Sequence, residues 1–192
     1  MNRLVLFDFD GTLIKGDSTK LVYEALYGSK FLFIFKYYFI NAVGLLLLLV
    51  LGKDIYLRES RRQFLVSKFD DIKSTNFKMQ AKKRMFSTTN ALMNNYIRHG
   101  YVVVIVSAGY KEIIELILES GTGYDIIANS IFDKDQEVIN YDTKVIRLNG
   151  QYKSGYSVKA AYGNTQGDIP MLELAEKAFW VDENGKISNF SN

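Results

Sequence analysis

Polar side chains that could do chemistry together follow three separate apolar segments of the chain. Asp8 and Asp10 come directly after the first segment, and Ser107 comes directly after the second. The third is followed by residues 163–168, which read GNTQGD. In open α/β sheets the ligand site lies at the carboxyl ends of the strands. If the three segments are strands of one sheet, these polar residues converge in one site.

Asp8 and Asp10 are two positions apart, so strand geometry would point both side chains to the same face. Two carboxylates this close repel each other unless a positive group is bound between them. Magnesium favours oxygen ligands and usually also joins a phosphate. The sequence therefore predicts Mg²⁺ as the cofactor of this site.

The composition excludes several other kinds of chemistry. The 192 residues include no cysteine and one histidine, His99. This rules out a disulfide framework, a thiolate zinc site, a cysteine nucleophile and a site built from several histidines. His99 precedes a glycine, which is typical of a helix C-terminus and not of a catalyst. Catalysis must then rest on carboxylates, hydroxyls, lysines and a hard metal ion.

Four segments together resemble the motifs of the haloacid dehalogenase superfamily. They are DFDGT at 8–12, Ser107 after an apolar run, a downstream lysine, and Gly163-Asn164 followed by Asp168. More narrowly, the sequence is similar to the phosphoserine-phosphatase-like subfamily, including members that act on phosphatidylglycerophosphate. The motifs span nearly the whole chain. The resemblance implies a phosphatase that depends on Mg²⁺, and Asp10 argues against the dehalogenase branch.

The resemblance also implies a role for each motif residue. Asp8 would be the nucleophile that forms an aspartyl-phosphate. Asp10 would protonate the leaving oxygen and later deprotonate the attacking water. Thr12 and Ser107 would bind the phosphoryl oxygens. The Asp8 carboxylate and the backbone carbonyl of Asp10 would bind the metal.

The lysine of the resemblance has two candidates. Lys144 begins a segment that resembles the Lys-Val-x-x-Leu helix start of the family, and we choose it as the catalytic and phosphate-binding lysine. Lys159 is the alternative, and either could be an ordinary surface lysine. Asp17 falls where phosphoserine phosphatases carry a substrate-contacting acid, but it could equally cap the next helix. Ser107, taken alone, could also be a helix N-cap.

The fourth motif departs from the family pattern. Asn164 stands where the family usually has Asp, so it offers the metal an amide oxygen without a negative charge. We expect a weaker affinity for Mg²⁺, with Asp168 left to bind the metal or to orient its waters. Two alternatives to a working enzyme stay open. One is a weakened phosphate-binding or membrane-associated module. The other is a receiver-type signalling domain, which would not need a helical insert at 15–85.

The apolar segments indicate the fold class. Short strand-like runs at 4–7, 101–106, 125–128, 160–162 and 178–181 alternate with helical or turn sequence. This alternation predicts an α/β fold with a Rossmann-like parallel sheet. Between the first two runs, residues 56–95 are mixed polar and apolar, as expected for helices. We expect a catalytic core of residues 1–14 and 86–192, with a helical cap inserted at 15–85.

The stretch Phe31–Leu51 is long and apolar, and Lys36 is its only charge. By length it could span a bilayer. A single crossing would, however, separate the first strand from the rest of its sheet. Two interpretations are favoured, a buried hairpin of the cap or an apolar surface that dips into one leaflet of a membrane, and a true span is the third.

Residues 53–84 follow this stretch and carry ten basic and four acidic side chains, a net charge of +6. Such a segment is either a solvated helical face or a surface that meets an anionic substrate or membrane. Arg58, Arg61 and Arg62 are expected to contribute to membrane binding. The overall charge of +3 is too small to argue for nucleic acid. We therefore expect a small-molecule or lipid phosphate as substrate, and a cytoplasmic protein with peripheral contact at the inner face of the membrane.

Overall fold

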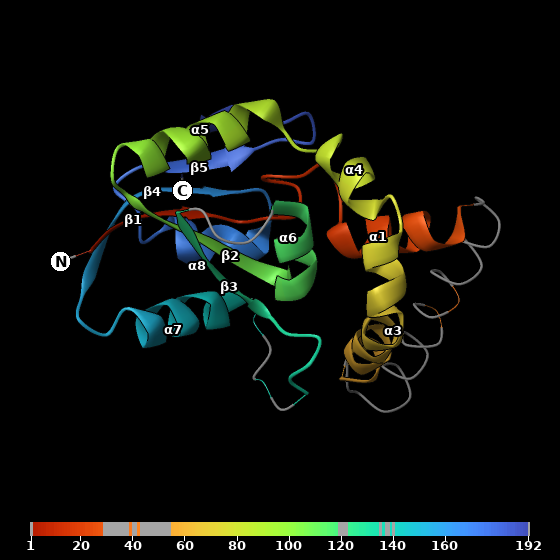
Figure 1. Cartoon of the computed structure of the whole chain (residues 1–192). Coiled ribbons are helices and arrows are strands. Elements are labelled where there is room, and N and C mark those ends of the chain that lie inside the picture. The colour runs from red at the N-terminus through yellow and green to blue at the C-terminus, as the bar shows by residue number, and fades with distance from the viewer. Residues whose placement is uncertain are drawn as a thin grey trace.

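The computed structural model describes residues 2–28, 39, 42, 55–118, 123–134, 136, 139 and 141–191 (Figure 1). Its centre is a six-stranded sheet with the order β3-β2-β1-β4-β5-β6. All neighbouring strands are parallel except β6, which runs antiparallel to β5. The strands are β1 (Asn2–Phe7), β2 (Val102–Tyr110), β3 (Tyr124–Asn129), β4 (Tyr156–Gly163), β5 (Ala178–Val181) and β6 (Ile187–Asn189).

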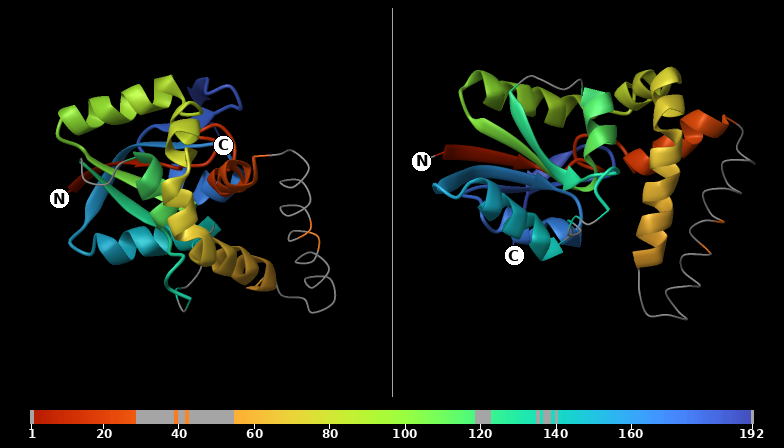
Figure 2. Two further views of the ribbon diagram at one scale, coloured as in Figure 1. Left: turned by 45° about the vertical axis from the view of Figure 1, so that its right-hand side comes forward. Right: turned by 60° about the horizontal axis from the view of Figure 1, so that its bottom comes forward.

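Helices cover both faces of the sheet, and a further group of helices stands beyond the carboxyl ends of the strands (Figures 1 and 2). The helices are α1 (Ser18–Tyr27), α3 (Ile55–Ser74), α4 (Phe77–Lys82), α5 (Ser87–Arg98), α6 (Lys111–Leu118), α7 (Tyr141–Gln151), α8 (Ile169–Leu172) and a 3-10 turn at Gln166–Asp168. Helices α1, α3 and α4 form this further group. The sequence thus predicted the α/β class and the parallel sheet correctly.

Strand β1 lies in the middle of the sheet and is buried on both faces. Val5 and Phe7 pack in the core cluster that includes residues of α5 and α6. Leu4 and Leu6 pack in the opposite cluster, with residues of α7 and α8. Burial on both faces explains why this strand is a continuous apolar run without polar alternation.

Three aromatic rings stack across neighbouring strands of the sheet. Phe7 of β1, Tyr162 of β4 and Phe179 of β5 are in register. The ring centroids of Phe7 and Tyr162 are 4.5 Å apart, and those of Tyr162 and Phe179 are 4.9 Å apart. The hydroxyl of Tyr162 lies 3.1 Å from that of Tyr96 on α5. The ladder therefore ties three strands to the helix that covers them.

Two elements differ from the sequence predictions. Strand β2 continues to Tyr110, beyond the expected end at Val106, and its pairing with β3 shifts register between those two residues. Ser107 therefore lies within the strand and caps no helix. Strand β6 was not predicted, because its three residues are too few to form an alternating pattern. His99 follows α5 as its C-cap, as expected.

The chain leaves the sheet after β1 and returns before α5 at neighbouring positions. The backbone N–H of Lys15 donates to the Arg84 carbonyl at 2.8 Å, and that of Phe86 donates to the Leu13 carbonyl at 3.0 Å. The Thr89 hydroxyl of α5 also donates to the carbonyl of Thr12 at 2.8 Å. The stretch that holds α1, α3 and α4 is therefore inserted between β1 and α5, and its two ends lie side by side.

The apolar stretch Phe31–Leu51 lies outside the described residues, apart from Phe39 and Ala42. Its two interpretations, buried hairpin or membrane surface, both remain predictions. Among the helices that the structure describes, none combines the length and the apolar character needed to cross a membrane.

The aromatic ladder generates a stability prediction. We expect Phe7→Ala to lower the free energy of unfolding by about 3–5 kcal/mol, because a fully buried ring is lost from a packed core. Phe132→Ala is the matched control, since Phe132 is 59% exposed and touches only the edge of the Phe69 ring among the described rings. Its cost should be about 1 kcal/mol or less. Urea denaturation of the three proteins measures both values, and equal losses would contradict the ladder's role.

Candidate active site

The residues singled out in the sequence gather at the carboxyl edge of the sheet. A cavity of about 350 Å³ is lined by Asp8, Asp10, Ser107, Lys144 and residues 165–167. They come from the ends of β1, β2 and β4 and from the first turn of α7. A second cavity, of about 510 Å³, extends from Asp10 toward α3 and the loop after β3. The sheet thus places a polar site where parallel strands end.

Lys144 holds two of the predicted acids together. Its ammonium donates to Asp8 Oδ1 at 2.8 Å and to Asp168 Oδ1 at 2.5 Å, and the residue is 3% exposed. Burial lowers the pKa of Lys144, but the two carboxylates outweigh burial and the net shift is upward. Lys144 therefore remains charged. Lys159, the alternative lysine, lies on the surface and pairs with Glu176 instead.

Asp168 organises the fourth motif. Its second oxygen, Oδ2, accepts hydrogen bonds from the Asn164 N–H at 3.0 Å, the Thr165 N–H at 2.8 Å and the Thr165 hydroxyl at 2.9 Å. Gly163 allows this close approach, because a Cβ there would lie 2.5 Å from the Cβ of Asp168. Asp168 Oδ1 thus binds Lys144 and Oδ2 binds this turn, and a role of Asp168 at a metal stays a prediction.

Three other groups lie close together, namely the Asp8 carboxylate (Oδ2), the backbone carbonyl of Asp10 and the Asn164 side-chain amide. Asn164 points one amide atom at the other two, 2.9 Å from the Asp10 oxygen and 3.3 Å from the Asp8 oxygen. An octahedral Mg²⁺ with bonds of 2.0–2.1 Å keeps neighbouring ligand oxygens about 3 Å apart. Carboxylate, carbonyl and amide oxygens at this spacing fit Mg²⁺.

These three groups are of different chemical kinds. Within the described residues, no three Asp, Glu or His side chains cluster in a way that could hold an ion. The Asp10 contribution comes from its backbone, which leaves its carboxylate available for another task.

That carboxylate turns toward the start of α1. Asp10 accepts hydrogen bonds from the Ser18 N–H at 2.8 Å and from the Ser18 hydroxyl at 3.2 Å. Burial, with the charges of Asp17 and Asp8, raises the pKa of Asp10 to about 8. Burial also raises the pKa of Asp8 to about 6, against the opposing effect of Lys144. The higher pKa lets Asp10 hold a proton at neutral pH, as a general acid must.

The other predicted site residues, Ser107, Thr12 and Asp17, have different surroundings. Ser107 is buried, lines the smaller cavity, and its hydroxyl accepts from the Gly109 N–H at 3.0 Å. Thr12 is fully buried, and its hydroxyl lies 3.3 Å from Asp8 Oδ2 and 3.2 Å from Asn164 Oδ1. Asp17 caps α1 by accepting from the Lys20 N–H at 3.1 Å, and it also lines the larger cavity. Both interpretations of Asp17 therefore stay open.

Gly11 is required by the approach of Asn164. It has a φ of +79°, and a Cβ at this position would overlap the Asn164 side-chain amide. The turn after β1 is thus shaped to receive the fourth motif.

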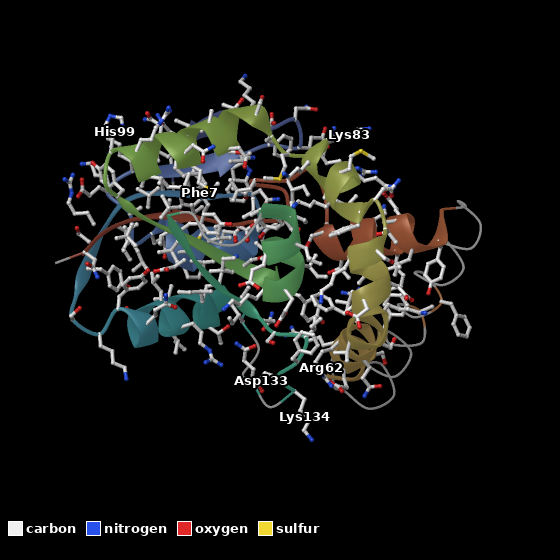
Figure 3. All side chains as sticks on the ribbon, in the orientation of Figure 1. Phe7, Arg62, Lys83, His99, Asp133 and Lys134 are labelled. Carbon is white, nitrogen blue, oxygen red and sulfur yellow. The ribbon has the colours of Figure 1, made fainter. Side chains whose placement is uncertain are left out.

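The larger cavity contains residues whose placement the sequence analysis did not foresee. Arg58, Arg61 and Arg62, which the sequence suggested for a membrane surface, line this cavity. The Arg62 guanidinium donates to both carboxylate oxygens of Glu59 at 2.7 Å and to the Ile131 carbonyl at 2.7 Å. Figure 3 shows Arg62 beside the loop that carries Asp133 and Lys134. The available signal was their spacing, since positions three and four apart share one helical face.

Comparisons with known proteins find one family and a set of structures with the same fold. The family model of haloacid dehalogenase-like hydrolases matches residues 5–173. No curated protein sequence matches the chain.

Several solved structures share the fold. A protein with unknown function from Bordetella pertussis Tohama I has a TM-score of 0.71 and 15% identity, covering 93% of this chain and 89% of its own. A phosphoserine phosphatase in its apo form has a TM-score of 0.58 and 19% identity, covering 93% and 85%. A phosphoserine phosphatase described as a phospho-aspartyl intermediate analogue has a TM-score of 0.51 and 17% identity, covering 92% and 85%.

The buried lysine generates a second stability prediction. Lys144→Met keeps the length of the side chain but leaves the carboxylates of Asp8 and Asp168 buried without their cation. We expect a loss of about 3–5 kcal/mol in the free energy of unfolding. Lys159→Met is the matched control, and it should change stability little because its pair is exposed. Denaturant titrations test both, and a Lys144→Met protein as stable as the control would contradict this account.

Proposed function

The chain belongs to the haloacid dehalogenase-like hydrolase family, and on this premise we propose that it is a Mg²⁺-dependent phosphatase with Asp8 as its nucleophile. The observation that carries the proposal is the position of Asp8. One of its oxygens is bound to Lys144, and the other faces the Asp10 carbonyl and the Asn164 amide. A carboxylate between a fixed ammonium and a cation site can approach an anionic phosphate.

The proposed reaction has two steps. The Asp8 carboxylate attacks phosphorus, the bond to the leaving oxygen breaks, and Asp10 gives that oxygen its proton. Water then attacks the phosphorus of the aspartyl-phosphate, Asp10 takes the proton of this water, and the bond to Asp8 breaks. Inorganic phosphate leaves and Asp8 is regenerated. Bound Mg²⁺ would supply positive charge that offsets the repulsion between carboxylates and phosphate.

The donors divide into two groups. Ser107 and Lys144 line the smaller cavity, and we propose that they bind the phosphoryl oxygens. Thr12 lies behind Asp8 with no exposed surface, so its contribution is to position the nucleophile and Asn164. Asn164, Asp8 and the Asp10 carbonyl are the proposed metal ligands. Asp168 acts through Lys144 and the turn of the fourth motif.

Residues 15–85 form the proposed cap, which selects the leaving group. The larger cavity joins Asp10 to α3 and is lined by both charged and apolar groups. Its volume of about 510 Å³ suits a leaving group larger than a few atoms. We favour an amphipathic or lipid phosphate, with a phosphoserine-like small molecule as the alternative.

A surface of α4 is suited to an anionic membrane. Met79 is 54% exposed and stands among the exposed side chains of Lys78, Lys82 and Lys83. Lys83 lies well apart from Arg62 and the larger cavity (Figure 3). These lysines replace the three arginines as the basis for the proposed peripheral contact. A basic side chain near an anionic surface contributes on the order of 1 kcal/mol.

The nucleophile is tested by exchanging single carboxylates for amides. We expect Asp8→Asn to abolish hydrolysis of p-nitrophenyl phosphate with Mg²⁺, because an amide cannot form the phospho-enzyme. Asp10→Asn should slow turnover by about 10²–10⁴-fold, since proton transfer contributes about this much. Circular dichroism checks that both variants are folded. Normal turnover by Asp8→Asn would contradict the mechanism, and a wild-type protein that binds phosphate without hydrolysis would favour the weakened module.

Membrane contact is tested by sedimentation with liposomes. We expect the wild-type protein to sediment with anionic liposomes at low salt and less with neutral ones, because screening weakens surface attraction. Replacing Lys78, Lys82 and Lys83 by Ala should reduce binding without changing hydrolysis of a small phosphate ester. The control variant replaces three exposed lysines outside the proposed cap, Lys153, Lys177 and Lys186. If the wild type stays in the supernatant with both kinds of liposome, the lipid-phosphate proposal loses its main support.

A further inference from the structure

The Asn164 amide sits where its two orientations make opposite interactions. Its inner atom lies 2.9 Å from the Asp10 carbonyl oxygen, 3.2 Å from Thr12 Oγ1 and 3.3 Å from Asp8 Oδ2. All three neighbours are oxygens. Half a turn about the Cβ–Cγ bond exchanges the amide oxygen and nitrogen with little movement of heavy atoms, so the same position can hold an acceptor or a donor.

With the oxygen inward, the hydrogen bonds around the site are incomplete. Oδ1 then meets the Asp10 carbonyl and Asp8 Oδ2, two acceptors that offer no hydrogen. The Thr12 hydroxyl has one hydrogen but two acceptors within reach, Asp8 Oδ2 and Asn164 Oδ1. This orientation needs a positive charge among the oxygens, which is what a cation provides.

With the nitrogen inward, every group is satisfied without a cation. The NH₂ group donates to the Asp10 carbonyl at 2.9 Å, and its contacts with Thr12 and Asp8 become favourable as well. Thr12 Oγ1 then accepts from Asn164 and is free to donate its own hydrogen to Asp8 Oδ2. The contact with Asp10 has the length of an ordinary N–H···O hydrogen bond.

We propose that Asn164 is a two-way ligand, whose amide oxygen faces Mg²⁺ when the ion is bound and whose NH₂ group takes the place of the ion when it leaves. The metal-bound half of this inference rests on the proposed function, while the metal-free half rests on the hydrogen bonds alone. Asn164 is thus a positioning residue for Asp8 and the Asp10 carbonyl in both states.

Aspartate at this position could serve only one of the two states. Asn164→Asp would supply a stronger metal ligand, but without metal it would place a second carboxylate beside Asp8 Oδ2 and the Asp10 carbonyl and would remove their donor. The Asn side chain therefore trades affinity for a site that stays ordered when empty. Leucine at this position has a similar shape, but it supplies neither a donor nor a ligand.

The metal-free half is tested by thermal unfolding in EDTA. We expect Asn164→Leu and Asn164→Asp to unfold about 3–6 °C below the wild type, because each leaves buried acceptors without a donor. Asn94→Asp is the control for added charge, since Asn94 is exposed on α5. Saturating Mg²⁺ should raise the midpoint of Asn164→Asp more than that of the wild type and should not restore Asn164→Leu to the wild-type value. Variants as stable in EDTA as Asn94→Asp would overturn the proposal.

The rotation of the Asn164 side-chain amide is tested by nuclear magnetic resonance. The Asn164 side-chain NH₂ signals, identified by their loss in Asn164→Leu, should shift when Mg²⁺ is added to the wild type. The midpoint of this shift should match the Mg²⁺ dissociation constant from calorimetry. Unshifted signals under saturating Mg²⁺ would overturn the proposal. Neither experiment needs turnover, so an inactive protein that passes them would contradict the phosphatase function and leave this inference standing.

Discussion

Burying the Asp8 carboxylate is the constraint on which the rest of the site depends. A carboxylate inside a protein is costly unless charge and hydrogen bonds compensate it. Lys144 provides the charge at 2.8 Å, and Asp168 in turn holds Lys144 at 2.5 Å. Asp168 also fixes the turn that carries Asn164. One buried acid therefore fixes the end of β1, the start of α7 and the loop after β4 relative to one another.

Much of this arrangement could be predicted because strand ends are marked in the sequence. Leu4–Phe7 is apolar because both faces of β1 are buried, and Asp8 follows where the strand reaches the edge of the sheet. Lys144 was identified from its helix start, and the structure places it against Asp8. Pairings between distant side chains carry no such local signal. The alignment of the Asn164 amide with the Asp10 carbonyl depends on how two loops meet in space.

The arginines of α3 are a second feature that the sequence could not place. Their number suggested a surface for anions, and their spacing placed them on one helical face. Only the packing of α3 against the loop after β3 decides which way that face points. Arg62 donates to the Ile131 carbonyl and to Glu59, which holds it at the cavity that all three arginines line. A count of charges along the chain contains no information about this choice.

The central place of β1 has a consequence for how the chain acquires its fold during synthesis. Both neighbours of this strand are distant in sequence, since β1 pairs with β2 at Val102 and beyond and with β4 up to Tyr162. At about 5–20 residues per second, a ribosome needs on the order of ten to thirty seconds to deliver both partners. Until β2 emerges, the apolar residues of β1 have no neighbouring strand, and the side of β1 that pairs with β4 stays open for longer. The nascent chain must therefore shield β1, through transient contacts or a chaperone, until β4 emerges.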